Sequence, residues 1–119
     1  MELQEYEQLR RTETDVVGIE SLRMKQSRFV RLISLLIQFA ILNGFEITFA
    51  DAFAKTGHID YSLHYIRLAL DINLFKHEQY LTARLDYEFL GEYWESLGGS
   101  WGGRFGDGCH FSLEHEGRR

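Results

Sequence analysis

The apolar run "FVRLISLLIQFAIL" at residues 29–42 limits most strongly how this chain can fold. It is too short to span a bilayer, which takes about 20 apolar residues, and it contains Arg31, Ser34 and Gln38. These polar residues are three and four positions apart, so they form one stripe along a helix. The run therefore predicts a mostly buried helix with one polar seam, which ends near Asn43-Gly44.

The remainder of the chain divides into shorter segments. We expect the main helix to start between residues 19 and 27. Residues 45–53 ("FEITFADAF") and 66–75 ("IRLALDINLF") alternate between apolar and polar positions, which predicts two strands. Residues 82–99 predict a second helix, whose apolar stripe at i, i+4 is Leu85, Phe89, Tyr93 and Leu97. Between strand and helix, "KHEQ" predicts a turn, and a glycine-rich loop leads from residue 100 into a last short strand.

This order of elements predicts an α+β fold, a small antiparallel sheet with packed helices. With 119 residues the chain is expected to form one domain over residues 21–119, preceded by an arm or short helix at residues 1–20. The single cysteine, Cys109, excludes an internal disulfide.

The charge balance bears on partners and location. Thirteen basic and 18 acidic side chains give a net charge of −5, which argues against a nucleic-acid partner because such proteins carry a basic patch. We also expect no membrane insertion, a monomer, and synthesis in the cytoplasm without a signal peptide.

Two histidines and two aspartates stand in apolar or glycine-rich surroundings. His64 precedes Asp71 by seven residues, so in a straight strand they would face opposite ways. They converge only if the chain bends between His64 and Ile66. Asp107 and His110 follow glycines that let the backbone turn both toward one cleft.

Such a set fits a zinc hydrolase, which needs three protein ligands and a carboxylate that takes a proton from water. His64, Asp71 and His110 would be the ligands and Asp107 the base. The alternative is structural: Asp71 on a solvated strand face, Asp107 as a turn cap and His110 half-buried. The residues alone leave both interpretations open.

The segments "SLHYIRLALD" and "WGGRFGDGCHF" resemble two motifs of a known family. This is the D-alanyl-D-alanine carboxypeptidase and L-alanyl-D-glutamate endopeptidase family, zinc enzymes that share the Hedgehog/DD-peptidase fold. The chain is similar in particular to short phage and prophage endolysins of this type, over residues 27–112.

The resemblance implies a role for each motif residue. His64, Asp71 and His110 resemble the zinc ligands, and Asp107 resembles the acid that activates the attacking water. Three further positions are carried over as substrate-contacting or supporting residues: Ser62 as the motif serine, Trp101 as part of the cleft wall, and Arg67.

Two positions depart from the family pattern. Many members have glycine where this chain has Arg67, and many have an arginine where this chain has Ala54. That arginine would face the carboxylate of the substrate. Arg67 is expected on the same strand face as Asp71 and could take over this contact.

Other reactive side chains have simpler interpretations. His58, His77 and His115 are expected in a loop, in a turn and near the tail, all in solvent. Cys109 is expected to be a packed thiol that points away from His110.

The expected function is therefore that of a zinc-dependent peptidase, with zinc as cofactor, which hydrolyses an amide bond in the peptide stem of peptidoglycan. The resemblance further implies that it is made in the cytoplasm of a bacterial host and acts on the cell wall after release, or in the virion. One alternative is a non-catalytic phage structural or interaction protein that keeps the fold. The other, a metal-dependent nuclease, is disfavoured by the acidic balance.

Overall fold

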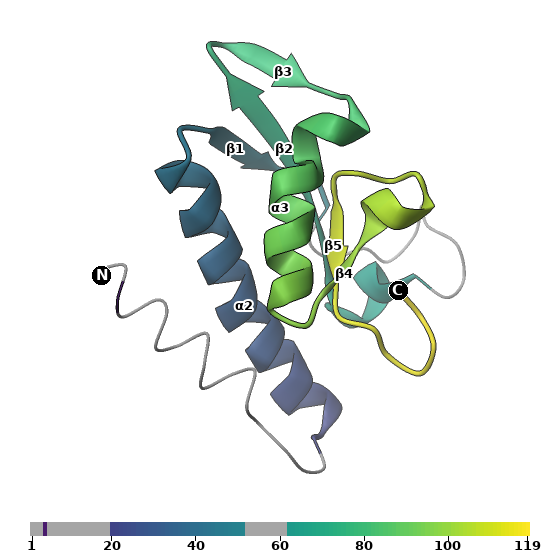
Figure 1. Cartoon of the computed structure of the whole chain (residues 1–119). Coiled ribbons are helices and arrows are strands. Elements are labelled where there is room, and N and C mark those ends of the chain that lie inside the picture. Colours follow the sequence, from purple (N-terminus) through teal and green to yellow (C-terminus); the bar gives the residue numbers. More distant parts are fainter. Residues whose placement is uncertain (1–3, 5–19, 52–61) are drawn as a thin grey trace.

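The computed structural model describes residue 4 and residues 20–51 and 62–119. The elements, in chain order, are α2 (Leu22–Leu42), β1 (Glu46–Phe49), the 3-10 turn η1 (Leu63–Ile66), β2 (Ala69–Lys76), β3 (Gln79–Leu81), α3 (Arg84–Ser96), β4 (Ser100–Trp101), the 3-10 turn η2 (Gly102–Phe105) and β5 (His110–Ser112) (Figure 1). The predicted α+β class with a small antiparallel sheet is confirmed. Most of the expected arm, the end of the first predicted strand and Ala54 lie outside the described residues.

Strand β2 is the centre of the sheet. Its second half pairs with β1 on one side and with β3 on the other, while its first half pairs with β5, which in turn pairs with β4. Every pairing is antiparallel. Because β2 touches three other strands, a side chain at its middle lies where all parts of the sheet meet.

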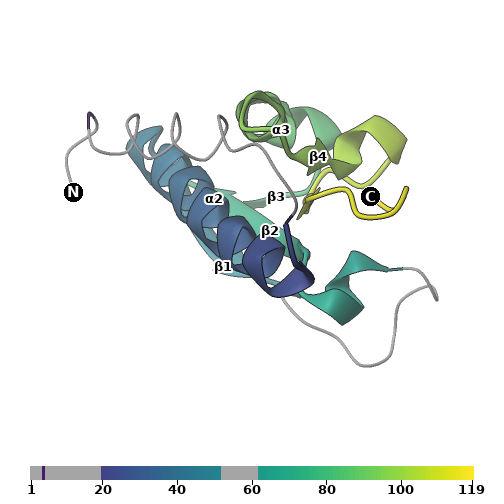
Figure 2. The ribbon, with the colours of Figure 1, turned by 90° about the horizontal axis from the view of Figure 1, so that it is seen from below.

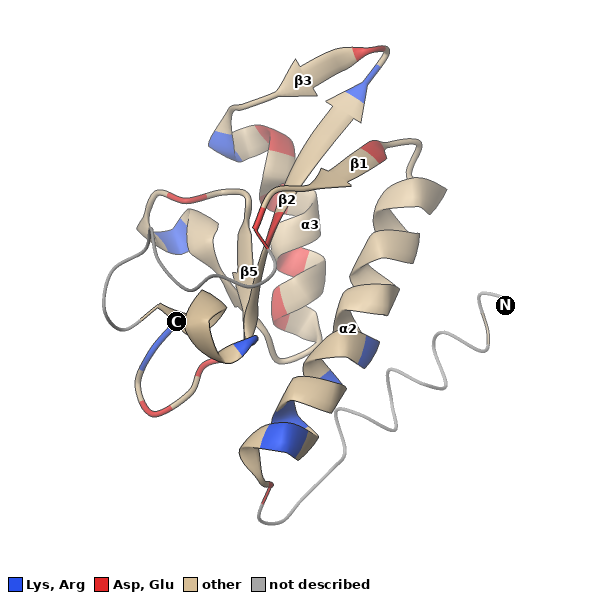
Figure 3. Ribbon diagram, turned by 180° about the vertical axis from the view of Figure 1, so that it is seen from behind, with Lys and Arg blue, Asp and Glu red and all other residues tan. Residues whose placement is uncertain are grey.

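Both long helices cover one face of the sheet (Figures 1 and 2). Ile72 and Leu74 of β2 point into this layer, where they are buried with Leu32 and Leu36 of α2 and with Trp94 of α3. Seen from behind, the sheet stands in front of the helices (Figure 3). Side chains alternate along a strand, so Asp71 and Asn73, on either side of Ile72, face away from the helices.

Helix α2 follows the prediction from its sequence. Ser21 caps its start by accepting a hydrogen bond from the Met24 N–H, and Gly44, at φ +87°, follows its end. Arg31 and Ser34 of the polar seam are exposed. Within the described parts of the chain, no helix combines the length and the apolar character needed to cross a membrane.

Helix α3 differs from the prediction in its start and in one residue of its apolar stripe. It begins at Arg84, and β3, which was not predicted, precedes it. Leu85, expected in the apolar stripe, is 73% exposed. The other three members of the stripe face the core: Leu97 is buried, and Phe89 and Tyr93 are partly buried against it. The helix also buries Tyr87, Leu90, Gly91 and Trp94. The buried side is wider than predicted because α3 packs against β4 as well as α2, and an i, i+4 pattern in the sequence does not show a second neighbour.

Helix α3 and β4 approach unusually closely at a glycine. A Cβ atom added to Gly91 would lie 2.1 Å from a ring carbon of Trp101. The indole therefore lies directly against the backbone of the helix, and its Nε1 donates a hydrogen bond to the Gly108 carbonyl at 2.8 Å. This contact anchors the loop that leads to His110.

Candidate metal centre

The turn η1 places His64. Ser62 caps the turn, and its hydroxyl accepts a hydrogen bond from the His64 N–H at 3.2 Å. Arg67 then takes a left-handed conformation, φ 58° and ψ 38°, before β2 begins at Ala69. The chain thus bends between His64 and Asp71. Only with such a bend can the side chains of His64 and Asp71 point to the same place.

The backbone of Asp71 is held by hydrogen bonds on one edge of β2. Its N–H donates to the Asp51 carbonyl at 2.7 Å, and its carbonyl accepts from Ala50 N–H at 2.9 Å. On the other edge Asp71 is the direct cross-strand partner of His110. Directly opposed residues project on the same face of an antiparallel sheet, so Asp71 and His110 point to one place.

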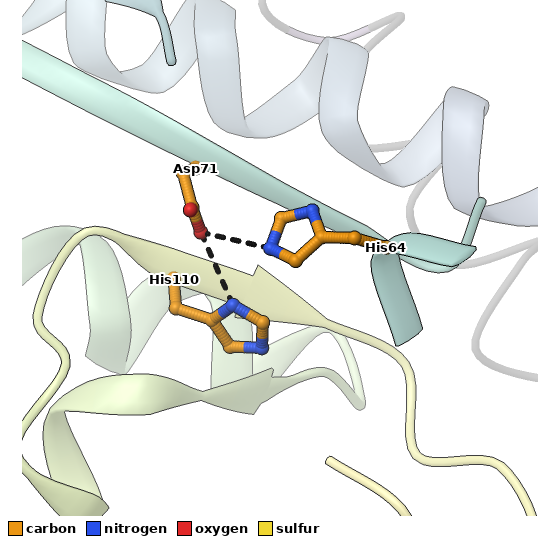
Figure 4. Close-up of side chains that lie close together, drawn as sticks. All are labelled: His64, Asp71 and His110. Atoms are coloured by element: carbon orange, nitrogen blue, oxygen red, sulfur yellow. Dashed lines mark hydrogen bonds and ion pairs between the residues drawn. The ribbon is translucent and has the colours of Figure 1, made fainter. Parts of the chain in front are cut away.

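Figure 4 shows the three side chains around one carboxylate oxygen. Asp71 Oδ1 lies 3.2 Å from His64 Nε2 and 3.1 Å from His110 Nδ1. One ligand atom from each residue lies within 4.8 Å of the other two. His64 and His110 are buried, and Asp71 is partly buried.

These distances fit a zinc ion. Four ligand atoms placed tetrahedrally about 2.0–2.1 Å from zinc lie about 3.3 Å from one another, close to the two separations between Asp71 Oδ1 and the histidine nitrogens. Two imidazoles and a carboxylate are also ordinary zinc ligands. Within the described parts of the chain, this is the one group of three or more histidine, cysteine, aspartate or glutamate side chains with such geometry.

The protonation state of Asp71 suits a metal ligand. Burial of this carboxyl would by itself raise its pKa, but hydrogen bonds from His110 and His64 outweigh the burial and lower the pKa to about 2. At neutral pH the group is therefore a carboxylate, the form that binds metals.

Asp107, the predicted base, lies three residues before His110 in an exposed turn. Its N–H donates to the Gly102 carbonyl at 2.8 Å, and its own carbonyl accepts from the His110 N–H at 3.2 Å. A Cβ atom on Gly102 would lie 2.3 Å from that carbonyl oxygen and 2.6 Å from His110 Cβ. A glycine at this position is therefore what allows Asp107 and His110 to lie in one tight turn.

Cys109 supports the turn and lies outside the group of possible ligands. Its side chain is half-buried, and its Sγ donates to Asp107 Oδ1 at 3.4 Å. Burial raises the pKa of this thiol to about 12, and the Asp71 and Asp107 carboxylates add to the rise. The group is thus a protonated thiol at neutral pH, packed against the core as expected from its sequence.

The expected strand position of Arg67 is corrected. Arg67 precedes β2 in the left-handed conformation, so it does not share a strand face with Asp71. Trp101 is 1% exposed and packs against Gly91 and Gly103. A side chain this deeply buried supports the surrounding backbone and presents almost no surface of its own.

The two other histidines in the described part of the chain, His77 and His115, stand apart from the cluster. His77 is exposed in the turn between β2 and β3. His115, expected in solvent, is half-buried, with its Nδ1 3.3 Å from Lys25 Nζ. His58 lies outside the described residues.

Comparison with protein families bears on the same part of the chain. Residues 55–113 match the model of a family described as D-alanyl-D-alanine carboxypeptidase. The match supports this peptidase family. It spans His64, Asp71, Asp107 and His110, and the metal dependence of the family agrees with the cluster that the structure brings together. No curated protein matches the chain.

Proposed function

We propose that the chain is a zinc-dependent peptidase that hydrolyses an amide bond in the peptide stem of bacterial peptidoglycan. The observation that carries the proposal is the convergence of His64, Asp71 and His110, one ligand atom of each lying within 4.8 Å of the other two. The family match over residues 55–113 supports the same substrate class. The proposal includes a fold of the Hedgehog/DD-peptidase type. It also includes a role as a phage or prophage endolysin that acts on the wall after release or in the virion.

Each residue of the site has a distinct task. His64, Asp71 and His110 would hold the metal, and the β2–β5 pairing fixes Asp71 and His110 against each other. Zinc, when bound, would polarise the carbonyl of the cleaved amide and lower the pKa of water. Asp107 takes the proton from the attacking water and passes it to the departing amine. Ser62 orients His64 by capping its turn.

The substitution Asp107→Asn tests the assignment of the base. The amide has nearly the shape of the carboxylate but does not accept a proton at neutral pH. We expect the variant to keep its zinc and its thermal midpoint and to lose about two to four orders of magnitude in rate. Metal content, melting temperature and the release of new amino groups from purified peptidoglycan are measured on one preparation.

A matched control is Asp86→Asn, which changes a carboxylate at the start of α3. It is expected to keep full activity. If Asp107→Asn loses its zinc, Asp107 is a ligand. If it stays as active as the parent, the base lies elsewhere, and Glu114 and Glu116 are the next candidates. A folded, zinc-loaded parent that cleaves no stem peptide would favour a non-catalytic structural or interaction protein.

A further inference from the structure

The face of the sheet that carries Asp71 continues beyond the metal cluster. Side chains two residues apart on a strand share a face and lie about 7 Å apart, so Asn73 follows Asp71 on this face. Thr48 of β1 is the direct partner of Asn73, and Tyr80 of β3 is the partner of Phe75. All these residues therefore project away from α2 and α3, on the side of Asp71.

Thr48, Asn73 and Tyr80 form a hydrogen-bonded row, here called the polar strip. The Tyr80 hydroxyl donates to Asn73 Oδ1 at 3.2 Å, and Asn73 Nδ2 donates to Thr48 Oγ1 at 3.3 Å. Asparagine is disfavoured inside strands, yet here its amide is oriented by two neighbours. These two bonds leave one Asn73 N–H and the Thr48 hydroxyl hydrogen as donors and the Tyr80 oxygen as an acceptor.

Tyr80 of the strip and the proposed base Asp107 line the same hollow, which has a volume of about 190 Å³. The other lining residues are Thr82, Tyr87, Gly106, Gly108 and Cys109. The Tyr87 hydroxyl is already committed, because it donates to the Leu81 carbonyl at 2.7 Å and accepts from the Leu74 N–H at 3.1 Å. The part of the hollow that Tyr87 lines is therefore held in place. Tyr80, in contrast, is 54% exposed and accessible to a ligand.

We propose that the polar strip positions the substrate: Thr48, Asn73 and Tyr80 bind the amide groups of an extended stem peptide, and the hollow receives the residue next to the cleaved bond. This inference rests on the proposed function. The chemistry of the strip selects the ligand. Its three side chains are neutral and offer both donors and acceptors, which matches peptide amides better than a carboxylate or a phosphate. Its place beside Asp71 and Asp107 puts such a peptide within reach of the site.

Kinetic measurements on the zinc-loaded full chain test the proposal. The probes are two synthetic stem peptides, one that ends in D-alanyl-D-alanine and one that contains an L-alanyl-D-glutamate bond. Tyr80→Phe removes one hydroxyl and keeps the ring that packs on Phe75 at 5.3 Å. We expect KM for the cleaved peptide to rise about 3- to 10-fold, the effect of one neutral hydrogen bond, with kcat within about twofold.

Asn73→Leu replaces the amide at the centre of the strip by an apolar side chain of similar size. This substitution is expected to raise KM further. Gln79→Ala is the matched control, because Gln79 neighbours Tyr80 in β3 and so faces the opposite side of the sheet. It should leave both constants unchanged. Zinc content and melting temperature are recorded for every variant, and if Asn73→Leu fails to fold, Tyr80→Phe decides.

The outcomes separate this inference from the proposed function. Values of KM within about twofold of the parent for folded Tyr80→Phe would overturn the polar strip as a binding surface. So would a fall in kcat without a change in KM, which assigns Tyr80 to the chemistry or to the metal. A parent protein that cleaves neither peptide would instead overturn the proposed function.

Discussion

At the scale of single residues, the backbone next to the cluster holds a strained position. Arg67 adopts φ 58° and ψ 38°, a region that side chains with a Cβ atom enter at a cost of about 1–2 kcal/mol. Glycine enters it freely, which accounts for the glycine that the resemblance leads us to expect at this place. The strained residue is what turns the chain from His64 into β2.

Replacement of Arg67 by glycine should relieve this strain. We expect Arg67→Gly to raise the free energy of unfolding by about 0.5–1 kcal/mol, since part of the gain is lost to the greater freedom of glycine in the unfolded chain. Urea unfolding measures the change. Arg67→Asn removes the charge but tolerates the left-handed region, so it serves as the control. If both variants are less stable than the parent, contacts of the arginine side chain outweigh the strain.

Gly102 offers a second test at this scale. The added Cβ of Gly102→Ala would press on the Asp107 carbonyl and on His110 Cβ, at 2.3 and 2.6 Å. We expect a loss of about 1–3 kcal/mol in unfolding free energy and zinc affinity at least about tenfold weaker, measured by metal titration. Gly44→Ala is the control. Gly44 has φ +87° and open space around it, so its strain should lower stability without a change in zinc affinity.

At the scale of elements, Tyr87 ties α3 to the sheet. The side chain is 3% exposed, and its hydroxyl bridges the Leu81 carbonyl of β3 and the Leu74 N–H of β2. Burial raises the pKa of this phenol, so it stays protonated and continues to donate. One hydroxyl thus connects three elements beside the hollow.

Tyr87→Phe should therefore cost more than the loss of one ordinary hydrogen bond. It leaves the Leu74 N–H without this partner in a buried place, and we expect the free energy of unfolding to fall by about 1–3 kcal/mol. Tyr80→Phe, which removes an exposed hydroxyl, is expected to change it by less than about 0.5 kcal/mol. Equal effects of the two substitutions in urea unfolding would contradict the bridging role of Tyr87.

At the scale of the whole molecule, the cluster joins segments that are distant in sequence. His64 lies in η1, Asp71 in β2 and His110 in β5, and the last two are 39 residues apart. The unfolded chain does not hold the three donor atoms together, so a metal bound at this site binds the folded state preferentially. Metal binding and global stability are therefore linked.

Removal of the metal should lower the melting temperature. With free zinc at about 100 times its dissociation constant, the folded state gains about 2.7 kcal/mol, which for a domain of this size corresponds to about 10 °C. Scanning calorimetry with and without a chelator measures the difference. His64→Ala should abolish it, while His115→Ala, a half-buried histidine outside the cluster, should retain it. Coincident melting temperatures with and without chelator for the parent would contradict a zinc site.

Much of the framework follows from local sequence signals. The bounds of α2 are set by Ser21 and by Asn43-Gly44, and capping residues act within one turn of the helix, so they can be recognised without the rest of the fold. The alternation in β2 likewise shows which residues face the core, because the period of two is a property of the strand itself. The two aspartates and two histidines of the candidate site were identified through the resemblance of "SLHYIRLALD" and "WGGRFGDGCHF" to two motifs of a known family.

Tertiary packing decided the rest. Strands β3 and β4 have three and two residues, too few for a pattern, and they exist because β2 and β5 offer them partners. The exposure of Leu85 depends on where α3 meets its neighbours. The convergence of His64 with Asp71 needed the bend at Arg67, and the approach of His110 needed the pairing of β2 with β5. The sequence shows which potential ligands are present and how far apart they lie along the chain. Only long-range contacts set the distances between their donor atoms in space.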